Sequence, residues 1–307
     1  MQSQENILSN LKMNPKIART KNGRIEFDIT EGGFPVVLSV HGGIGGRDQA
    51  RVMVSWLDQD KYRLLCPSRP GYLGTPLESG KTIEEQADLF AALLDELKID
   101  KVACISASAG GPPAYMFAIR HPDRVWALIA IDSISGYYDM PDTAGVFTQL
   151  LFLSPLGQKL NKMLSEKKPD MFLQQLYQSV AFFTKDQLKK HVSFALKSPG
   201  GMDFIKAFMD TMYPYDVRKA GTENDMAQYR KLIHLPVEKI KCPSLIIHGT
   251  HDADVKFYDG VYAYEHIPDA ERYWIEEGSH LGFWLSPHAQ TAQELARNFL
   301  DRNAKDR

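Results

Sequence analysis

The sequence predicts an α/β fold, in which a mainly parallel sheet of eight strands carries helices on both faces and a helical cap is inserted. Short apolar runs alternate with amphipathic helical patterns at both ends of the chain. An Asn-Gly turn joins two short strands near the start, so one edge of the sheet is expected to be antiparallel. Residues 133–236 carry helical patterns without strand alternation, which indicates an insertion.

Each element is expected where one of these patterns occurs. Strands are expected at residues 17–20, 24–30, 34–40, 62–68, 101–107, 125–131, 243–249 and 272–277. Helices are expected at residues 47–60, 82–98, 111–121 and 256–266, and a last helix is expected to begin near Ser286. Thr82 and Glu85 have the spacing of a capping box, and Ser286 followed by Pro287 is typical of an N-cap and first helical residue.

The interruption of the alternation divides the chain into two parts. Residues 1–132 and 237–307 are expected to form the α/β core, and residues 133–236 are expected to form the helical cap, or lid. A chain of 307 residues that is 44% hydrophobic is long enough for one large core with such an insertion.

Composition and charge limit the classes of partner. The 36 basic and 38 acidic side chains nearly cancel, and no long basic run occurs, so no nucleic-acid partner is expected. The N-terminus lacks the apolar stretch of a signal peptide, and no apolar run is long enough to span a bilayer, so no membrane partner is expected. Three widely spaced cysteines, Cys66, Cys104 and Cys242, indicate buried free thiols in a reducing compartment, and the protein is expected to be cytoplasmic.

The stretch CISASAGGPP places Ser108 at the junction of a buried strand and a helix. A nucleophile on a sharp strand-to-helix turn needs small residues two places before and after it, and Ser106 and Gly110 occupy those positions. The N-terminus of the following helix directs N–H groups toward the same place, which suits a developing oxyanion. The alternative is a small-residue turn without a function.

A glycine-rich loop, HGGIGG at residues 41–46, directly follows the third strand. Glycines let a backbone approach a ligand closely, so the N–H of Gly43 is expected to form an oxyanion hole together with the N–H of Ala109. A phosphate-binding loop is an alternative, but no Lys-Ser/Thr pair follows, and the GxGxxG spacing of a dinucleotide site is absent from the loop. A plain turn is the other alternative.

Asp252 lies just beyond the strand at residues 243–249, where a carboxylate can orient and polarise a histidine. Asp254 is the competing candidate for this role. The density of His248, His251, Asp252 and Asp254 also admits a metal site, although no matching cluster of ligands occurs elsewhere. No metal and no cofactor are expected.

His280 is the histidine best placed to act as a base, because it lies in the loop after the last strand with Gly278 and Gly282 on either side. Four other histidines lie in polar segments and are expected to be exposed, namely His191, His234, His266 and His288. Ser108, Asp252 and His280 each follow a strand of the parallel sheet, at the edge where open α/β sheets build their sites.

Together these motifs resemble the α/β-hydrolase superfamily over nearly the whole chain outside the insertion. The segments SRPGYLGTP and HPDRV are more similar to its capped esterase, C–C hydrolase and epoxide-hydrolase branch than to the lipases. The resemblance implies Ser108 as nucleophile, Asp252 as acid, His280 as base, and the N–H groups of Gly43 and Ala109 as oxyanion hole. Ser106 departs from the usual glycine, and a serine nucleophile disfavours an epoxide hydrolase or dehalogenase.

The expected activity is hydrolysis of an ester through an acyl-enzyme, with a small-molecule substrate of small or medium size that is partly apolar. Gly42, Ile44 and Trp284 are expected to contact this substrate. The alternatives are a C–C bond hydrolase, an acyltransferase or perhydrolase with the same three residues, and a ligand-binding protein with little turnover. The sequence makes no prediction for the oligomeric state.

Overall fold

The computed structural model describes residue 11, residues 13–139 and residues 154–304. Most of the N-terminal segment that lacks a signal-peptide pattern, and residues 140–153 of the predicted insertion, therefore lie outside the described residues. Within the described residues the chain forms an eight-stranded sheet of order β1-β2-β4-β3-β5-β6-β7-β8. The strands are Lys16–Thr20 (β1), Gly23–Ile29 (β2), Val36–Val40 (β3), Arg63–Pro67 (β4), Val102–Ala107 (β5), Val125–Ile131 (β6), Ser244–Gly249 (β7) and Glu271–Ile275 (β8).

The sheet has the predicted mixture of strand directions. β2 pairs antiparallel with both β1 and β4, and the other neighbouring strands run parallel. Parallel strands need crossover connections, and the helices that supply them cover the two faces of the sheet. The fold class read from the sequence is thus confirmed.

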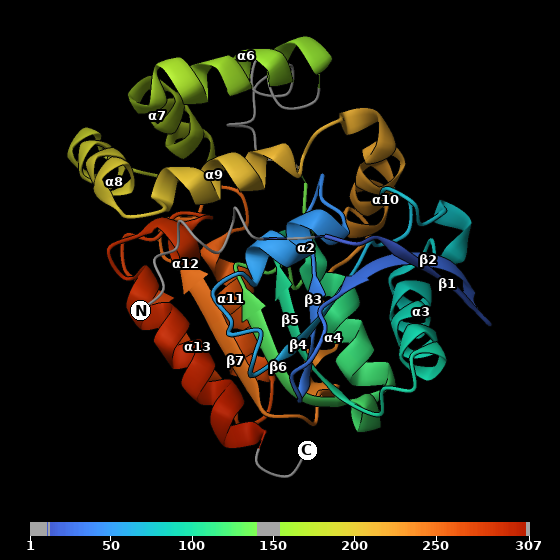
Figure 1. Cartoon of the computed structure of the whole chain (residues 1–307). Coiled ribbons are helices and arrows are strands. Elements are labelled where there is room, and N and C mark those ends of the chain that lie inside the picture. The colour runs from blue at the N-terminus through green and yellow to red at the C-terminus, as the bar shows by residue number, and fades with distance from the viewer. Residues whose placement is uncertain (1–10, 12, 140–153, 305–307) are drawn as a thin grey trace.

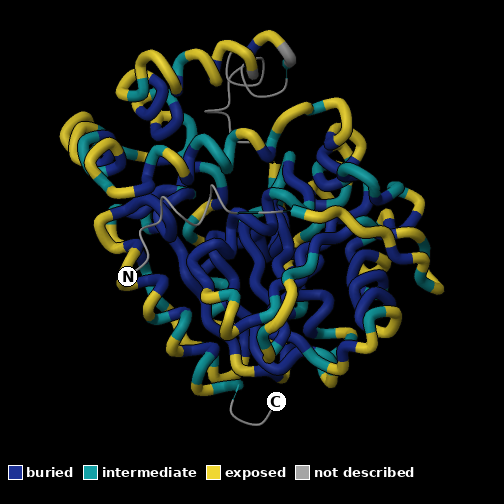
Figure 2. Tube along the Cα trace, in the orientation of Figure 1, coloured by how far each residue is buried: buried dark blue, intermediate teal, exposed yellow. Residues whose placement is uncertain are grey.

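Two apolar clusters, one on each face of the sheet, form the core (Figures 1 and 2). One contains residues of Ile83–Glu96 (α3), Gly111–Arg120 (α4) and Phe257–His266 (α11). The other contains residues of Arg47–Met53 (α2), Gly282–Leu285 (α12) and Ala289–Asn303 (α13). Because both faces are covered, β3, β5, β6 and β7 are buried along their whole length, which explains their nearly continuous apolar runs.

Among the residues described between β6 and β7, five α-helices occur: Pro155–Lys167 (α6), Pro169–Val180 (α7), Lys185–Lys197 (α8), Gly201–Asp210 (α9) and Lys219–Tyr229 (α10). In Figure 1 the arrowheads of β6 and β7 point toward this group of helices. The group therefore faces the carboxyl ends of the parallel strands. None of the helices in the described ranges combines the length and apolar character needed to cross a bilayer.

Local signals predicted the start of α3 correctly, because Thr82 accepts a hydrogen bond from Glu85 N–H and the Glu85 side chain caps in return. Two other helix boundaries were wrong. The helix expected to reach residue 60 ends at Met53, where i to i−3 hydrogen bonds replace the helical pattern. The last helix begins at Ala289, not near Ser286, since Ser286 accepts from the His288 N–H in a turn that precedes the helix.

The buried polar side chains include one that the sequence misassigned. His234, His266 and His288 are exposed as expected, but His191 is 1% exposed and stacks on Phe183 at a ring-centroid distance of 4.3 Å. His191 lies on a mostly polar helix, but it is buried because its ring stacks on Phe183 of the preceding loop. The three cysteines are free and buried, as predicted.

Candidate active site

Ser108 occupies a strained turn between β5 and α4. Its φ of 54° lies in the left-handed region that residues with a side chain rarely adopt. Two backbone hydrogen bonds hold the turn, since Ser108 N–H donates to Asp132 O at 3.1 Å and Ile134 N–H donates to Ser108 O at 3.1 Å. The turn leaves the Ser108 side chain at the wall of a cavity. This is the geometry expected of an exposed nucleophile on a rigid support.

The two small residues that flank Ser108 serve different purposes. A Cβ on Gly110 would lie 2.5 Å from Val40 O and 2.6 Å from His41 O, so only glycine lets the turn touch the end of β3. Ser106 is fully buried, and its hydroxyl lies 3.0 Å from the Ser133 hydroxyl. Ser106 therefore packs inside the core and takes no part in the cavity wall.

Asp252 and His280 meet in the loops after β7 and β8. The Nδ1–H of His280 donates to Asp252 Oδ2 at 2.7 Å. The other carboxylate oxygen of Asp252 accepts the N–H groups of Asp254 at 2.8 Å and Val255 at 3.0 Å, so three donors fix a carboxylate that is 2% exposed. Of the two aspartates that the sequence proposed for this role, the structure places Asp252 at Nδ1.

Asp254 instead faces the opposite ring nitrogen, with its Oδ2 3.3 Å from His280 Nε2. The Tyr138 hydroxyl donates to Asp254 Oδ1 at 2.6 Å and orients this carboxylate. Among the described residues, no hydrogen bond joins the Ser108 hydroxyl to His280. A carboxylate beside Nε2 favours a proton on that nitrogen, so this arrangement suits the imidazolium form of His280.

The charges around His280 agree with that assignment. Burial lowers the pKa of His280, but the negative charges of Asp252, Asp254 and Asp132 outweigh burial and raise it well above the usual value. His248 also lies in this cluster, where burial lowers its own pKa to about 4 and keeps it neutral. His280 must lose its Nε2 proton before it can accept a proton from Ser108. The neutral ring no longer carries the positive charge that attracts Asp254.

The negative charges around His280 are expected to determine how turnover depends on pH. In the wild type, kcat/KM is expected to rise with pH through the raised pKa of His280, because only neutral His280 accepts a proton. Asp254→Asn removes one of the charges that raise this pKa, and the midpoint of the acid limb is expected to fall by about one pH unit. Initial rates from about pH 6 to about pH 11.5, corrected for spontaneous hydrolysis of the ester, measure the midpoint. Glu276→Gln removes the same charge from an exposed position and is the control; an unchanged or higher midpoint in Asp254→Asn would contradict the assignment.

Gly43 and Ala109 lie beside Ser108. A Cβ on Gly43 would be 3.8 Å from Ala109 Cβ, and a Cβ on Gly42 would be 3.2 Å from Ser108 Cβ. Within the described part of the chain, neither the Gly43 N–H nor the Ala109 N–H donates a hydrogen bond to another residue. Two N–H groups are thus free to receive an anion next to the Ser108 hydroxyl.

One cavity of about 200 Å³ brings these groups together. Ser108, His280 and Asp254 line it, and so do all three residues expected to contact substrate, Gly42, Ile44 and Trp284. Helices α7, α9 and α10 contribute seven apolar residues to the wall, namely Leu176, Val180, Phe204, Ile205, Phe208, Met209 and Met226. The charged or titratable side chains on the wall are Asp132, Tyr138, Asp254 and His280, and none of the described lining residues is a lysine or arginine.

The alternative of a metal site can be tested on the same residues. Asp132, His248 and Asp252 place one ligand atom each within 4.8 Å of one another. His248 Nε2, however, lies 3.0 Å from the Val255 carbonyl oxygen, an acceptor that requires a proton on Nε2. His251 is directed away, toward Thr250 and Gln187. The proposed set of four ligands therefore does not converge on one point.

Sequence reasoning missed Asp132 and Tyr138. Asp132 directly follows β6 and is 1% exposed, and its Oδ1 accepts the Gly249 N–H at 2.7 Å. Burial, together with the charge of Asp252, raises the pKa of Asp132 well above the usual value. The rule that located Asp252, a carboxylate just after a parallel strand, applies equally to Asp132. Tyr138 carries no comparable signal.

Known proteins with similar sequences and structures include several that are named hydrolases. A model of the alpha/beta hydrolase fold family matches residues 35–287. The solved structure of an alpha/beta hydrolase fold protein from Nakamurella multipartita superposes with a TM-score of 0.87 at 31% identity, over 94% of this chain and 99% of that one.

Two curated relatives cover the chain to a similar extent. The uncharacterized hydrolase YcgS of Bacillus subtilis is 27% identical over 91% of this chain and 95% of its own length. The 2-hydroxy-6-oxononadienedioate/2-hydroxy-6-oxononatrienedioate hydrolase of Burkholderia vietnamiensis is 23% identical over 91% of each chain.

Proposed function

Because the chain belongs to the alpha/beta hydrolase fold family, we propose that it is a serine hydrolase that cleaves carboxylic esters through an acyl-enzyme. One observation carries the proposal. A histidine that is hydrogen-bonded through Nδ1 to a buried carboxylate, at 2.7 Å, lines the same cavity as a serine held at a positive φ. Nucleophile, base and orienting acid are the parts that acyl transfer to water needs.

In the mechanism we propose, neutral His280 accepts the Ser108 proton at Nε2 while Ser108 Oγ attacks the ester carbonyl carbon. The resulting oxyanion accepts hydrogen bonds from the N–H groups of Gly43 and Ala109. His280 then donates its proton to the departing alkoxide, and the acyl group remains on Ser108. Water then gives a proton to His280 Nε2 and attacks the acyl carbon, the bond between that carbon and Ser108 Oγ breaks, and His280 returns the proton to Ser108 as the acid is released. Asp252 holds the Nδ1 proton throughout and stabilises the imidazolium.

The side chains that line the cavity favour a substrate whose acyl group is uncharged. A substrate with a second carboxylate would bring a negative charge into an apolar pocket that already holds Asp132 and Asp254 and has no described lysine or arginine on its wall. The name of the Burkholderia vietnamiensis relative specifies a dicarboxylate substrate. We propose that this chain differs from that relative in substrate charge and acts on neutral esters.

A matched pair of substrates tests this proposal. 4-Nitrophenyl butyrate and mono-4-nitrophenyl succinate have acyl chains of four carbons and the same leaving group, but only the succinate carries a free carboxylate. We expect kcat/KM for the butyrate to be higher by about 100-fold or more, because an uncompensated charge must enter the pocket. A series of longer acyl chains would then give the preferred length. Preference for the succinate, or cleavage of a C–C bond in a dienedioate with no ester turnover, would contradict the proposal.

The division of the chain and its location are also proposals. Residues 133–236 are proposed to act as a cap, which is supported by the apolar wall that α7, α9 and α10 contribute to the cavity. A cytoplasmic location is supported by three free, buried cysteines.

A further inference from the structure

The direction of a backbone N–H depends on what holds the carbonyl of the preceding residue, because the two groups belong to one rigid trans peptide and point opposite ways. The Gly43 N–H shares its peptide with the Gly42 carbonyl. The Ala109 N–H shares its peptide with the Ser108 carbonyl, which accepts Ile134 N–H at 3.1 Å. Groups that bind these two carbonyl oxygens therefore determine the directions of the two proposed oxyanion donors, the N–H groups of Gly43 and Ala109.

Two donors bind the Gly42 carbonyl oxygen: Arg69 Nη2 at 3.0 Å and His41 Nδ1 at 2.8 Å. The tautomer of His41 is determined by its other nitrogen, since Nε2 accepts the Arg69 backbone N–H at 2.9 Å and the proton must therefore lie on Nδ1. Burial and the charge of Arg69 lower the pKa of His41 well below its usual value, which keeps the ring neutral. Arg69 thus acts on the Gly42 carbonyl both directly and through His41.

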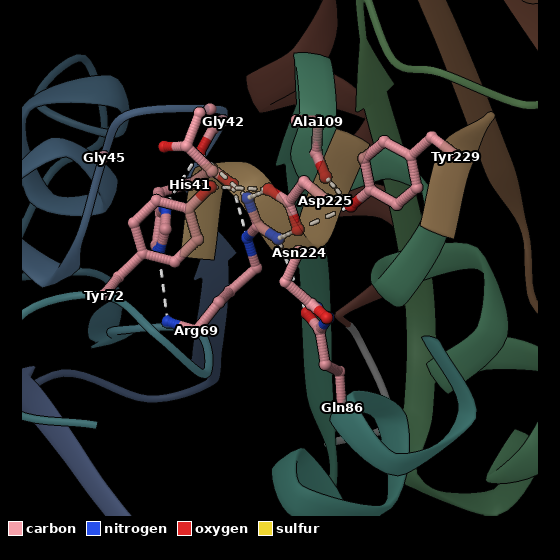
Figure 3. A network of polar contacts seen from close by, with 12 residues as sticks. His41, Gly42, Gly45, Arg69, Tyr72, Gln86, Ala109, Asn224, Asp225 and Tyr229 are labelled. Carbon is pink, nitrogen blue, oxygen red and sulfur yellow. Dashed lines mark hydrogen bonds and ion pairs between the residues drawn. The ribbon is translucent and has the colours of Figure 1, made fainter. Parts of the chain in front are cut away.

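Arg69 is itself held from the inserted helices (Figure 3). Its guanidinium is fully buried and forms a two-pronged ion pair with Asp225 of α10, at 2.8 Å and 2.7 Å. The Tyr72 hydroxyl donates to the same carboxylate at 2.6 Å. One turn along α10, the Tyr229 hydroxyl donates to the Ala109 carbonyl oxygen at 2.6 Å. Two residues of α10 therefore reach the two segments that carry the proposed oxyanion donors.

The guanidinium has the geometry for this role, whereas a lysine does not. Arg69 Nε donates to His41 O at 3.1 Å while Nη2 donates to Gly42 O and Asp225. A planar fork with several fixed donors can hold two successive carbonyls and a carboxylate at once, and an ammonium group is a single point of charge.

We propose that Arg69 and Asp225 are positioning residues of the oxyanion hole: α10 fixes Arg69, and Arg69 fixes the peptide that directs the Gly43 N–H toward the substrate. This inference rests on the proposed function, because it needs an oxyanion to form at Ser108. Neither side chain lines the cavity. Their effect on the reaction is therefore expected in the transition state and not in binding of the neutral ester.

Two variants test the proposal by different routes. Arg69→Lys keeps a cation opposite Asp225 but loses the fork, and Asp225→Asn keeps Arg69 but loosens it. In both, kcat for 4-nitrophenyl butyrate is expected to fall by about 10- to 100-fold with KM changed by less than about 3-fold, because a donor displaced by a fraction of an ångström serves the transition state poorly. Affinity for a trifluoromethyl ketone, which forms an anionic adduct with the nucleophile, is expected to fall in parallel. Affinity for butyl alcohol, a neutral ligand, is expected to stay the same.

Arg51→Lys is the matched control. Arg51 and Asp28 form another buried ion pair, at 3.2 Å with both side chains 3% exposed, and among the described residues no hydrogen bond or ion pair joins the Arg51 side chain to the loop at residues 41–46. Thermal unfolding shows which variants fold, and either folded test variant is sufficient. Wild-type kcat and ketone affinity in a folded test variant, or an equal loss in Arg51→Lys, would overturn the positioning role. If the wild type hydrolyses no ester and forms no adduct with the ketone, the proposed function fails instead.

Discussion

Ser108→Ala is expected to abolish covalent labelling by a fluorophosphonate and to lower kcat for 4-nitrophenyl butyrate by about a million-fold. The alanine removes the only atom that forms the acyl-enzyme bond and adds none, so KM and thermal stability are expected to change little. The turn itself is held by backbone hydrogen bonds to Asp132 and Ile134, which alanine retains. Intact-protein mass spectrometry measures the adduct, and initial rates measure kcat.

The matched control is Ser106→Gly, which restores the residue usual in this family at a position two places away. Ser106 contributes one buried hydroxyl contact to Ser133, and Ser133 keeps its hydrogen bond to Ile131 O at 3.2 Å when that contact is lost. Labelling and turnover are therefore expected to remain close to those of the wild type. Loss of labelling in Ser106→Gly, with retention in Ser108→Ala, would mean that the turn has been assigned in the wrong register.

Asp252→Asn is expected to give the second-largest loss, about 10⁴-fold in kcat at unchanged KM. An asparagine amide facing Nδ1 can donate a hydrogen bond to it, which moves the ring proton to Nε2. His280 then has no lone pair for the Ser108 proton, although its position is kept. Histidine-selective ¹⁵N NMR would report the change of tautomer directly.

The same experiment distinguishes the two aspartates that the sequence left open. If Asp254 were the residue that orients His280, Asp254→Asn would give the larger loss of kcat and Asp252→Asn the smaller. The hydrogen bond at Nδ1 predicts the reverse order. Comparison at the alkaline plateau of each pH profile removes the separate effect of Asp254 on the pKa of His280.

Much of the fold and of the candidate site follows from short stretches of sequence. Ser108 directly follows a strand, and Asp252 and His280 lie in the loops that follow two others. Parallel strands bring their carboxyl ends to one edge, so local patterns were enough to place these residues together. The capping box at Thr82 was read correctly for the same reason, since its two partners are three residues apart. The N-cap predicted at Ser286 failed because the short helix α12 ends there, and that depends on packing around Trp284.

Contacts between distant segments could not be read in this way. Arg69 and Asp225 are 156 residues apart, and nothing near either residue indicates its partner. Asp254 faces His280, and Tyr138, 116 residues away in the chain, binds Asp254 from a separate loop. In a sequence, an arginine in a loop and a carboxylate on a polar helix resemble ordinary surface residues. Arg69 and Asp225 become a buried pair only when the chain has folded.

The ion pair between Arg69 and Asp225 sets a rule for exchanging the inserted helices between relatives. Such a chimera would change the wall of the cavity while keeping Ser108, Asp252 and His280, which makes it attractive for altering substrate range. A donor segment without a carboxylate at the position of Asp225 would leave Arg69 buried and unpaired, at a cost of about 3–5 kcal/mol. The grafted segment should therefore keep a carboxylate and a tyrosine at the positions of Asp225 and Tyr229, or Arg69 should be replaced at the same time. Either choice leaves no unpaired charge between the new segment and the core.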